Sequence, residues 1–317
     1  MKIKLSYVIT TKNKLTYLKE VMPRLLEHVQ SDEEIVVTDG ASTDGSKEYL
    51  ENLFQSGKIH QFISERDKCE AHGWNKAFLM ARGELVKLIT DDDVFYYPAI
   101  RECREFMLIH PEIDVLRGNI AVADTGNFNS QQITVVNEYM DAFVNWLNGS
   151  QKPFLICGIS MMFRKDSLPL LGLFHTQTRM PDLEHSLRIA TLANMAFYTK
   201  VIAIHLENPA SITRAISPQE WKDEYERVTQ FYSPPGNINS KNNPPTLRQR
   251  IINLATRIMS YFNKMSSDSN SQTIHYPENL TGAHIVNDLA IDVIFKESDI
   301  WLDANNRNEG NILYKNS

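Results

Sequence analysis

Three consecutive aspartates, Asp91, Asp92 and Asp93, form the sharpest chemical signal in the sequence. Adjacent carboxylates repel one another, so a cation is expected to offset their charge, and a divalent metal with oxygen ligands is the simplest one. Such a metal would bridge diphosphate oxygens and stabilise a departing nucleoside diphosphate. A solvated acidic turn is the plain alternative. The apolar run at 85–89 and the aromatic cluster at 95–97 favour the rim of a pocket instead.

Two further aspartates stand where an acid can do chemistry. Asp39 follows an apolar run and is suited to accept a hydrogen bond from a nucleobase N–H or a ribose hydroxyl, although a plain turn aspartate is the simpler interpretation. Asp182 begins a helix-like segment, where the helix dipole favours an acid. It is also suited to act as a general base toward an attacking hydroxyl, with Glu184 as the spare candidate.

Alternating strands and helices are expected to position these groups. Apolar runs predict strands at 5–10, 34–38, 59–63 and 84–89, with helices at 15–29, 46–54 and 71–81. This alternation indicates an α/β domain with a parallel sheet covered by helices on both faces. Ligands of such sheets bind beyond the carboxyl ends of the strands. Residues 10–13, Asp39 and the aspartate triplet should therefore share one rim.

The pattern loosens after residue 98. We expect helices near 99–110, 138–147 and 182–194, and strands near 114–117, 133–136, 154–164 and 196–206. A Pro-, Asn- and Ser-rich stretch at 233–246 indicates a linker between a domain at 1–232 and a mainly helical extension at 247–317. Within that extension, 247–265 is a basic amphipathic helix candidate. It would pack on the domain or on a second subunit, or lie on an anionic membrane, and packing is the simpler interpretation.

Composition limits the classes of protein that need considering. Hydrophobic residues make up 42% and charged residues 23%, which is typical of a soluble globular chain, and the net charge of −6 argues against a nucleic-acid partner. The three scattered cysteines fit a reducing compartment. No apolar stretch is long enough for a membrane span, and the first one is too short for a signal peptide. We therefore expect a cytoplasmic protein, with peripheral contact at the inner face of a membrane left open.

Taken together, these motifs resemble the family-2 glycosyltransferases, which have the GT-A fold. Residues 6–13 are similar to the family's opening strand and its Thr-x-x-Asn turn, and residues 37–46 to its second-strand motif. The other similar segments, in chain order, are 64–68, 74–77, 81–84, the Asp-x-Asp position at 91–93, 163–165, 171–174 and 181–188. The resemblance covers about residues 4–215 and is closest to members that assemble bacterial polysaccharides and glycans.

The resemblance implies a reaction and a set of site residues. A sugar would pass from a nucleotide-diphosphate donor, with a UDP-sugar favoured, to a hydroxyl of a glycan or lipid-linked glycan. The displacement would be inverting and would need Mn²⁺ or Mg²⁺. The residues implied for the donor are Thr10, Thr11, Asn13, Asp39, Arg66, Asn75, Asp91 and Asp92. Asp91 and Asp93 would frame the metal, and Asp182 would be the catalytic base.

Some positions depart from the family pattern, and two other functions compete. Thr38 stands where an acid is usual, Pro181 replaces the glutamate before the base, and the triplet satisfies the Asp-x-Asp motif in two registers. His205 either reaches the metal or diphosphate, or is a structural histidine. A nucleotidyltransferase acting on a sugar phosphate would ordinarily have a glycine-rich loop at 12–14, which has no glycine. A degenerate, non-catalytic GT-A binding module is the other alternative, and the intact acids argue against it.

Overall fold

The computed structural model describes residues 2–150, 154, 158–207, 217–232 and 288–315. Its strands are β1 (Leu5–Thr11), β2 (Glu33–Asp39), β3 (Gln61–Ser64), β4 (Leu85–Leu88), β5 (Val94–Phe95), β6 (Val115–Asp124), β7 (Thr134–Val135), β8 (Met161–Arg164), β9 (Met195–Glu207) and β10 (Ile312–Tyr314). Its α-helices are α1 (Leu15–His28), α2 (Ser46–Gln55), α3 (Glu70–Met80), α4 (Tyr97–Ile109), α5 (Glu138–Leu147), α6 (Leu168–Leu171), α7 (Pro181–Leu192), α8 (Pro218–Phe231) and α10 (Asp288–Asn305).

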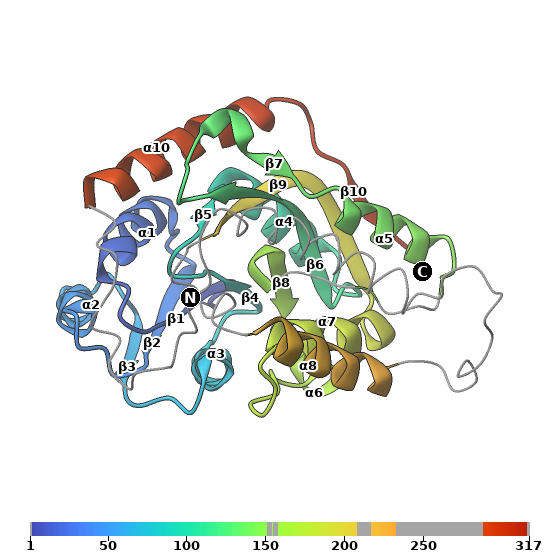
Figure 1. Cartoon of the computed structure of the whole chain (residues 1–317), viewed down its shortest axis with the longest axis horizontal. Coiled ribbons are helices and arrows are strands. Elements are labelled where there is room, and N and C mark those ends of the chain that lie inside the picture. Colours follow the sequence, from blue (N-terminus) through green and yellow to red (C-terminus); the bar gives the residue numbers. More distant parts are fainter. Residues whose placement is uncertain (1, 151–153, 155–157, 208–216, 233–287, 316–317) are drawn as a thin grey trace.

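One twisted sheet forms the centre of the molecule, with helices on both faces (Figure 1). Its order is β10-β9-β6-β8-β4-β1-β2-β3, with β5 added to β9 and β7 added to β6. The four strands β3, β2, β1 and β4 are parallel, and β6 is parallel to β9. Strand β8 runs antiparallel between β4 and β6. The predicted mostly parallel sheet flanked by helices is confirmed.

Strand β1 shows how the sequence builds two cores from one apolar run. Successive side chains of a strand point to opposite faces of the sheet. Tyr7 and Ile9 therefore join the core covered by α1, α4 and α10, whereas Val8 joins the core covered by α3 and α7. All seven residues of β1 are buried, which is why the sequence shows a continuous apolar run and no alternation.

Two strands differ most from their expected bounds. The strand expected at 154–164 is limited to Met161–Arg164, because a buried 3₁₀ turn, η2 (Gly158–Ser160), precedes it. The strand expected at 114–117 continues to Asp124, because β6 pairs with β9 along its whole length. Both differences come from partners that are distant in sequence.

The last described residues return to the sheet that the first residues begin. Helix α10 packs on α1, where Arg24 Nε lies 2.9 Å from Asp299 Oδ2 and the guanidinium lies 5.0 Å from the Phe295 ring centroid. Strand β10 pairs antiparallel with β9. Residues 288–315 thus share the core of the N-terminal part. The expected linker at 233–246 and the basic helix at 247–265 lie outside the described residues.

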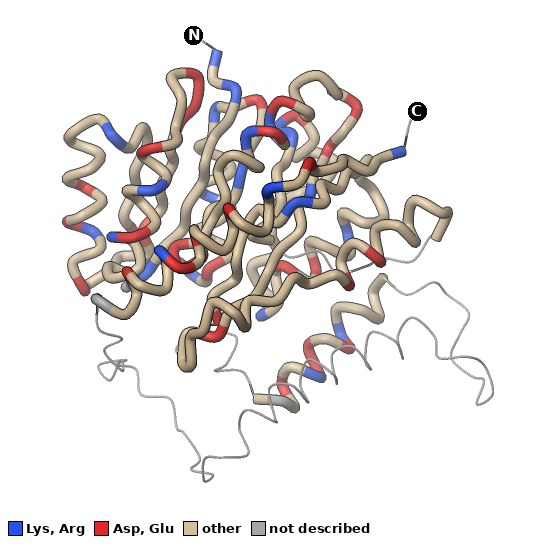
Figure 2. The backbone as a smooth tube through the Cα atoms, turned by 90° about the horizontal axis from the view of Figure 1, so that it is seen from above, with Lys and Arg blue, Asp and Glu red and all other residues tan. Residues whose placement is uncertain are grey.

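Charge is mixed over the surface elements. Figure 2 shows Lys and Arg interspersed with Asp and Glu along the described part of the chain. In that same part, no helix combines the length and the apolar character needed to cross a bilayer.

Candidate active site

The carboxyl ends of β1, β2 and β4 meet at one rim, as the alternation of strands and helices predicted. Thr11 is the register partner of Asp39 across β1 and β2. The Thr11 hydroxyl also donates a 2.6 Å hydrogen bond to Asp91 Oδ2, across 80 positions of sequence. The rim therefore joins the second-strand aspartate to the aspartate triplet through Thr11.

Asp39 and Asn13 build the loops at this rim. Asp39 is fully buried, and its carboxylate accepts hydrogen bonds from Ser42 N at 3.1 Å, from the Ser42 hydroxyl and from the Ser64 hydroxyl at 2.6 Å. Asn13 has a left-handed backbone, with φ of 54°, and its side-chain oxygen accepts from Thr43 N at 2.8 Å. These bonds hold the two loops together beside the strand ends. A contact between Asp39 and a nucleobase stays a prediction.

Helix α3 contacts β1 at a glycine. A Cβ on Gly73 would overlap the Thr10 hydroxyl and would lie 3.1 Å from the Asp67 carboxylate. Thr10 therefore lies at the junction of β1 and α3, next to Asp67, whose carboxylate pairs with Lys76 Nζ at 2.9 Å. Asp67 is a polar residue of this corner that the sequence analysis did not single out.

Two residues predicted near the donor lie apart from these contacts. The Asn75 amide donates to Phe174 O at 2.8 Å and accepts from Phe174 N at 2.9 Å, so it braces the loop before α7. Arg66 is exposed in the loop between β3 and α3. Their contribution to ribose or diphosphate binding stays a prediction.

Asp93 accepts more hydrogen bonds than either of the other two aspartates. It is only 2% exposed, and its Oδ1 accepts from His205 Nδ1 at 3.0 Å and from Leu206 N at 2.8 Å. Its Oδ2 accepts from the Thr90 hydroxyl at 2.5 Å. Burial opposes the charge of Asp93, but His205 and these hydrogen bonds lower its pKa. Burial alone would lower the pKa of His205, and the Asp93 carboxylate raises it to about 9.

Asp91 and Asp92 keep more of their coordinating capacity. Asp91 accepts from Thr11, and Asp92 Oδ2 lies 2.6 Å from Lys14 Nζ. In the described part of the chain, the second oxygen of each carboxylate has no hydrogen-bond partner. Burial and the charge of Asp92 raise the pKa of Asp91 to about 7, and burial and the charge of Asp93 raise that of Asp92. The residues around Asp91 and Asp92 therefore supply too little positive charge to balance both carboxylates.

The donors present fit a divalent cation. Among the described residues, no group of three or more His, Cys, Asp and Glu side chains is drawn together closely enough to hold a metal. The unengaged oxygens of Asp91 and Asp92 are nevertheless the hard ligands that Mg²⁺ and Mn²⁺ prefer. His205 is fixed through Nδ1 by Asp93, and a carboxylate in that position commonly orients a metal-binding histidine. The His205 side chain is 45% exposed.

Asp182 lies at the first turn of α7, against the η2 turn. A Cβ on Gly158 would come within 3.2 Å of Asp182 Oδ1, so the carboxylate lies close against the backbone of this turn. Desolvation by the surrounding protein raises the pKa of Asp182, and the charge of His205 lowers it. Asp182 and the triplet's histidine partner thus act on one another electrostatically, although they come from different elements.

Glu70 is a further acid of this region that the sequence analysis did not single out. It is the first residue of α3 and accepts a 3.3 Å hydrogen bond from Trp74 Nε1. Desolvation by neighbouring atoms and the charge of Asp182 raise its pKa to about 7. Acids are common in the first turn of a helix because the helix dipole favours them there, so no local sequence pattern distinguishes Glu70.

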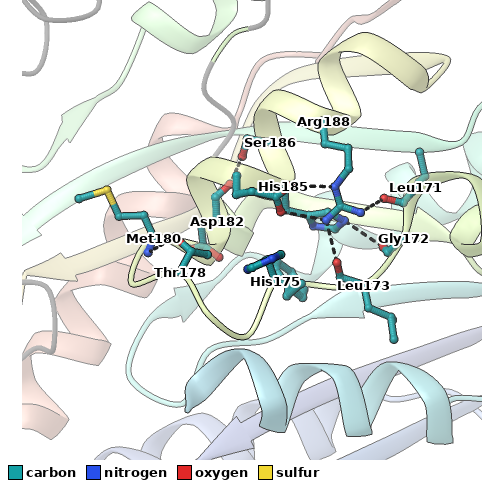
Figure 3. A network of polar contacts seen from close by, with 12 residues as sticks. Leu171, Gly172, Leu173, His175, Thr178, Met180, Asp182, His185, Ser186 and Arg188 are labelled. Atoms are coloured by element: carbon teal, nitrogen blue, oxygen red, sulfur yellow. Dashed lines mark hydrogen bonds and ion pairs between the residues drawn. The ribbon is translucent and has the colours of Figure 1, made fainter. Parts of the chain in front are cut away.

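A network of polar contacts holds α7 and the preceding loop (Figure 3). Arg188 donates to Leu171 O, to Leu173 O at 2.7 Å and to both oxygens of Glu184 at 3.1 and 3.0 Å. The Tyr232 hydroxyl also donates to Glu184 Oε1, at 2.5 Å. These bonds commit Glu184, the spare base candidate, to holding the helix. They leave Asp182 as the acid of α7 that is available for chemistry.

His185 anchors the same helix from its buried side. It is 2% exposed, and its ring stacks on Phe163 with centroids 5.6 Å apart. Its Nε2 lies 3.2 Å from Gly172 O. Figure 3 marks this contact with a dashed line. Burial and the charge of Arg188 lower the pKa of His185 to about 4, so the ring is neutral near pH 7 and Nε2 donates to Gly172.

Solved structures share this arrangement of sheet and helices. TarS from S. aureus, solved in complex with UDP-GlcNAc, has 17% identity and a TM-score of 0.55 over 72% of this chain and 65% of its own. The mannosyltransferase PcManGT from Pyrobaculum calidifontis, solved in complex with GDP-Man and Mn²⁺, has 13% identity and a TM-score of 0.51 over 94% of this chain and 87% of its own. These likenesses confirm the GT-A fold.

Sequence comparison supplies the family. An uncharacterised glycosyltransferase of Nostoc sp. (strain PCC 7120) is 32% identical over 95 residues, which are 29% of this chain and 29% of that relative. The sequence profile described as "Glycosyl transferase family 2" matches residues 6–171, more than half of the chain. The chain belongs to glycosyl transferase family 2, as the ordered motifs indicated.

Proposed function

We propose that this protein transfers a sugar from a nucleoside-diphosphate donor to an acceptor hydroxyl in glycan assembly, with inversion at the anomeric carbon. The observation that carries the proposal is the aspartate triplet, joined to Thr11 and His205 at the strand ends of a family-2 sheet, with Asp182 within the electrostatic reach of His205. Family membership does not favour a nucleotidyltransferase.

The chain's own residues supply the proton chemistry and the binding. Asp182 takes the proton from the acceptor hydroxyl as that oxygen attacks the anomeric carbon from the face opposite the diphosphate. Thr10, Thr11 and Asn13 lie at the end of β1, where nucleotides bind in open α/β sheets. Asp39 supports the loop that follows β2, on the same side.

A divalent cation belongs to this proposal. Asp91, Asp92 and the Nε2 of His205 would hold it. Asp93, which the resemblance implied as the second metal ligand beside Asp91, would instead orient His205. Metal binding at Nε2 would replace a proton there. When bound, Mn²⁺ or Mg²⁺ neutralises charge that builds on the departing diphosphate.

The acceptor is proposed to approach from the side of α7 and α8. A hollow of about 590 Å³ lies there, and its lining includes Phe174, His175, Glu184, Phe231 and Tyr232. Phe231 is 86% exposed, so an aromatic face is presented to solvent beside a carboxylate. A glycan or lipid-linked glycan suits such a surface. A cytoplasmic location and membrane contact or self-association through residues 247–265 belong to the proposal as well.

A donor screen tests the function. Thermal unfolding is measured with UDP, GDP and their sugar conjugates, each with and without Mn²⁺. One nucleotide sugar is expected to raise Tm in a concentration-dependent way, since ligands that bind only the folded state stabilise it. Donor hydrolysis with that nucleotide sugar then shows release of nucleoside diphosphate. Release of pyrophosphate from a nucleoside triphosphate and a sugar phosphate would support the nucleotidyltransferase instead. Failure of every nucleotide sugar to bind or hydrolyse would support a non-catalytic module.

A further inference from the structure

A lysine side chain of the protein itself lies beside the aspartate triplet. Lys14 Nζ lies 2.6 Å from Asp92 Oδ2, and the two side chains are only 23% and 19% exposed. The ammonium group also lies 5.2 Å from the centroid of the Tyr17 ring. A pair this sheltered is screened weakly by salt, so Lys14 is a real counter-charge for Asp92.

The backbone is built to deliver Lys14 to this place. The left-handed Asn13 turns the chain just before Lys14. Lys14 N donates to the Ser46 hydroxyl at 3.2 Å, and α1 begins at the next residue. Leu15 N in turn donates to Asp44 Oδ2 at 3.0 Å. These bonds fix the backbone from which the Lys14 side chain extends to Asp92.

A second observation points to a ligand in the same space. The Tyr17 side chain is buried, with 7% of the residue exposed, and its hydroxyl has no hydrogen-bond partner among the described residues. Burial raises the pKa of Tyr17, the Lys14 charge lowers it, and Asp92 and Asp91 raise it, so the hydroxyl lies within the field of the same charges. Buried hydroxyls usually have a partner. An oxygen of a ligand held near the triplet would give Tyr17 one.

We propose that Lys14 competes with the divalent cation for Asp92, so that metal and nucleoside diphosphate bind cooperatively. The proposal rests on the proposed metal-dependent function. Without nucleotide, a metal on the unengaged oxygen of Asp92 lies beside the Lys14 ammonium, and repulsion between the two cations weakens metal binding. A nucleoside diphosphate brings negative oxygens that lie between the metal and the ammonium and offset the repulsion between these two cations. By linkage, each ligand then raises the affinity for the other by the same factor.

Metal affinity measured without catalysis tests this proposal. Mn²⁺ is titrated into the full-length protein and the Kd is read from the electron paramagnetic resonance signal of free Mn²⁺, first alone and then with saturating UDP or GDP. Lys14→Met should bind Mn²⁺ alone at least about tenfold more tightly than the wild type, within the usual range of such couplings. The nucleotide should strengthen Mn²⁺ binding to the wild type and have little effect on the variant. Lys14→Arg keeps the charge and should behave like the wild type.

Lys12→Met is the matched control. Lys12 is an exposed lysine of the same turn and forms no ion pair within the described part of the chain, so its loss changes net charge equally. Its Mn²⁺ affinity should stay within about twofold of the wild type, as screened charges interact weakly. Circular dichroism shows whether each variant is folded.

Three outcomes overturn the inference. Equal Mn²⁺ affinity of Lys14→Met and the wild type contradicts the inference about Lys14 and leaves the metal-dependent function in place. An equal gain in Lys12→Met shows that net charge alone is responsible. Absence of Mn²⁺ binding to every variant, with and without nucleotide, overturns this inference and the proposed metal together.

Discussion

Asp182 is the residue on which the proposed chemistry depends most directly. Asp182→Asn keeps the shape of the side chain but removes its ability to take a proton. We expect kcat for sugar transfer to fall by about 10²–10⁴-fold, the usual contribution of a general base. The Kd of the nucleoside diphosphate should change little, because Asp182 is proposed to face the acceptor. Steady-state kinetics and isothermal titration calorimetry check both parts. Normal transfer by the variant would remove Asp182 from the mechanism.

Single residues of the site differ in how far the sequence could predict them. The triplet and Asp182 were recognisable because each stands in an ordered local motif. The bond between Asp93 and His205 joins residues 112 positions apart and depends on β9 passing beside β5. The ion pair of Lys14 with Asp92 likewise depends on two loops that meet only in the folded sheet. No local pattern carries such information.

Helix α7 is positioned as a unit, and Arg188 ties it to the turn that precedes it. Its guanidinium bonds both sides of the 171–173 turn and pairs with Glu184. Arg188→Met would leave the Leu171 and Leu173 carbonyls and the Glu184 charge with fewer partners. We expect a loss of about 1–3 kcal/mol in the free energy of unfolding. We also expect a fall in kcat larger than the rise in donor KM, since Asp182 shares this helix. Denaturant unfolding and kinetics measure the two effects.

Arg227 on α8 is the matched control for Arg188. It pairs with Glu224, but its side chain is 56% exposed. Arg227→Met should therefore cost less than about 1 kcal/mol and leave kcat unchanged, as exposed ion pairs contribute little. Equal effects of the two substitutions would show that Arg188 is not a positioning residue.

At the level of elements, periodicity predicted the type and place of α1, α3 and α7 to within a few residues. Those helices bury a stripe of apolar side chains, and the stripe is a local property of the sequence. The extent of β6 and the shortness of β8 were not predictable in the same way. Each is set by its pairing with strands from other parts of the chain.

Residues 288–315 add a helix and a strand to the main domain, and sequence patterns could not predict where they pack. Strand β10 pairs with residues of β9 that lie more than 100 positions earlier, and composition suggested only a separate extension after 233–246. Phe295 is fully buried in the core shared with β1 and α1, whereas Ile300 on the same helix is 63% exposed. The contrast makes the role of residues 288–315 measurable.

Phe295→Ala should destabilise the entire fold and not a detached unit. Removing a fully buried phenylalanine costs about 3–5 kcal/mol, because transfer and cavity costs add. Ile300→Ala, on the exposed face of α10, should change stability by less than about 0.5 kcal/mol. Thermal unfolding is followed by intrinsic fluorescence, and the Tm is measured with and without nucleotide. If α10 belongs to the common core, Phe295→Ala lowers the Tm of a single cooperative transition. The stabilisation that the nucleotide gives at high temperature then falls in parallel. A separate early transition that leaves the main one unshifted would show that α10 is dispensable to the sheet on which the aspartates depend.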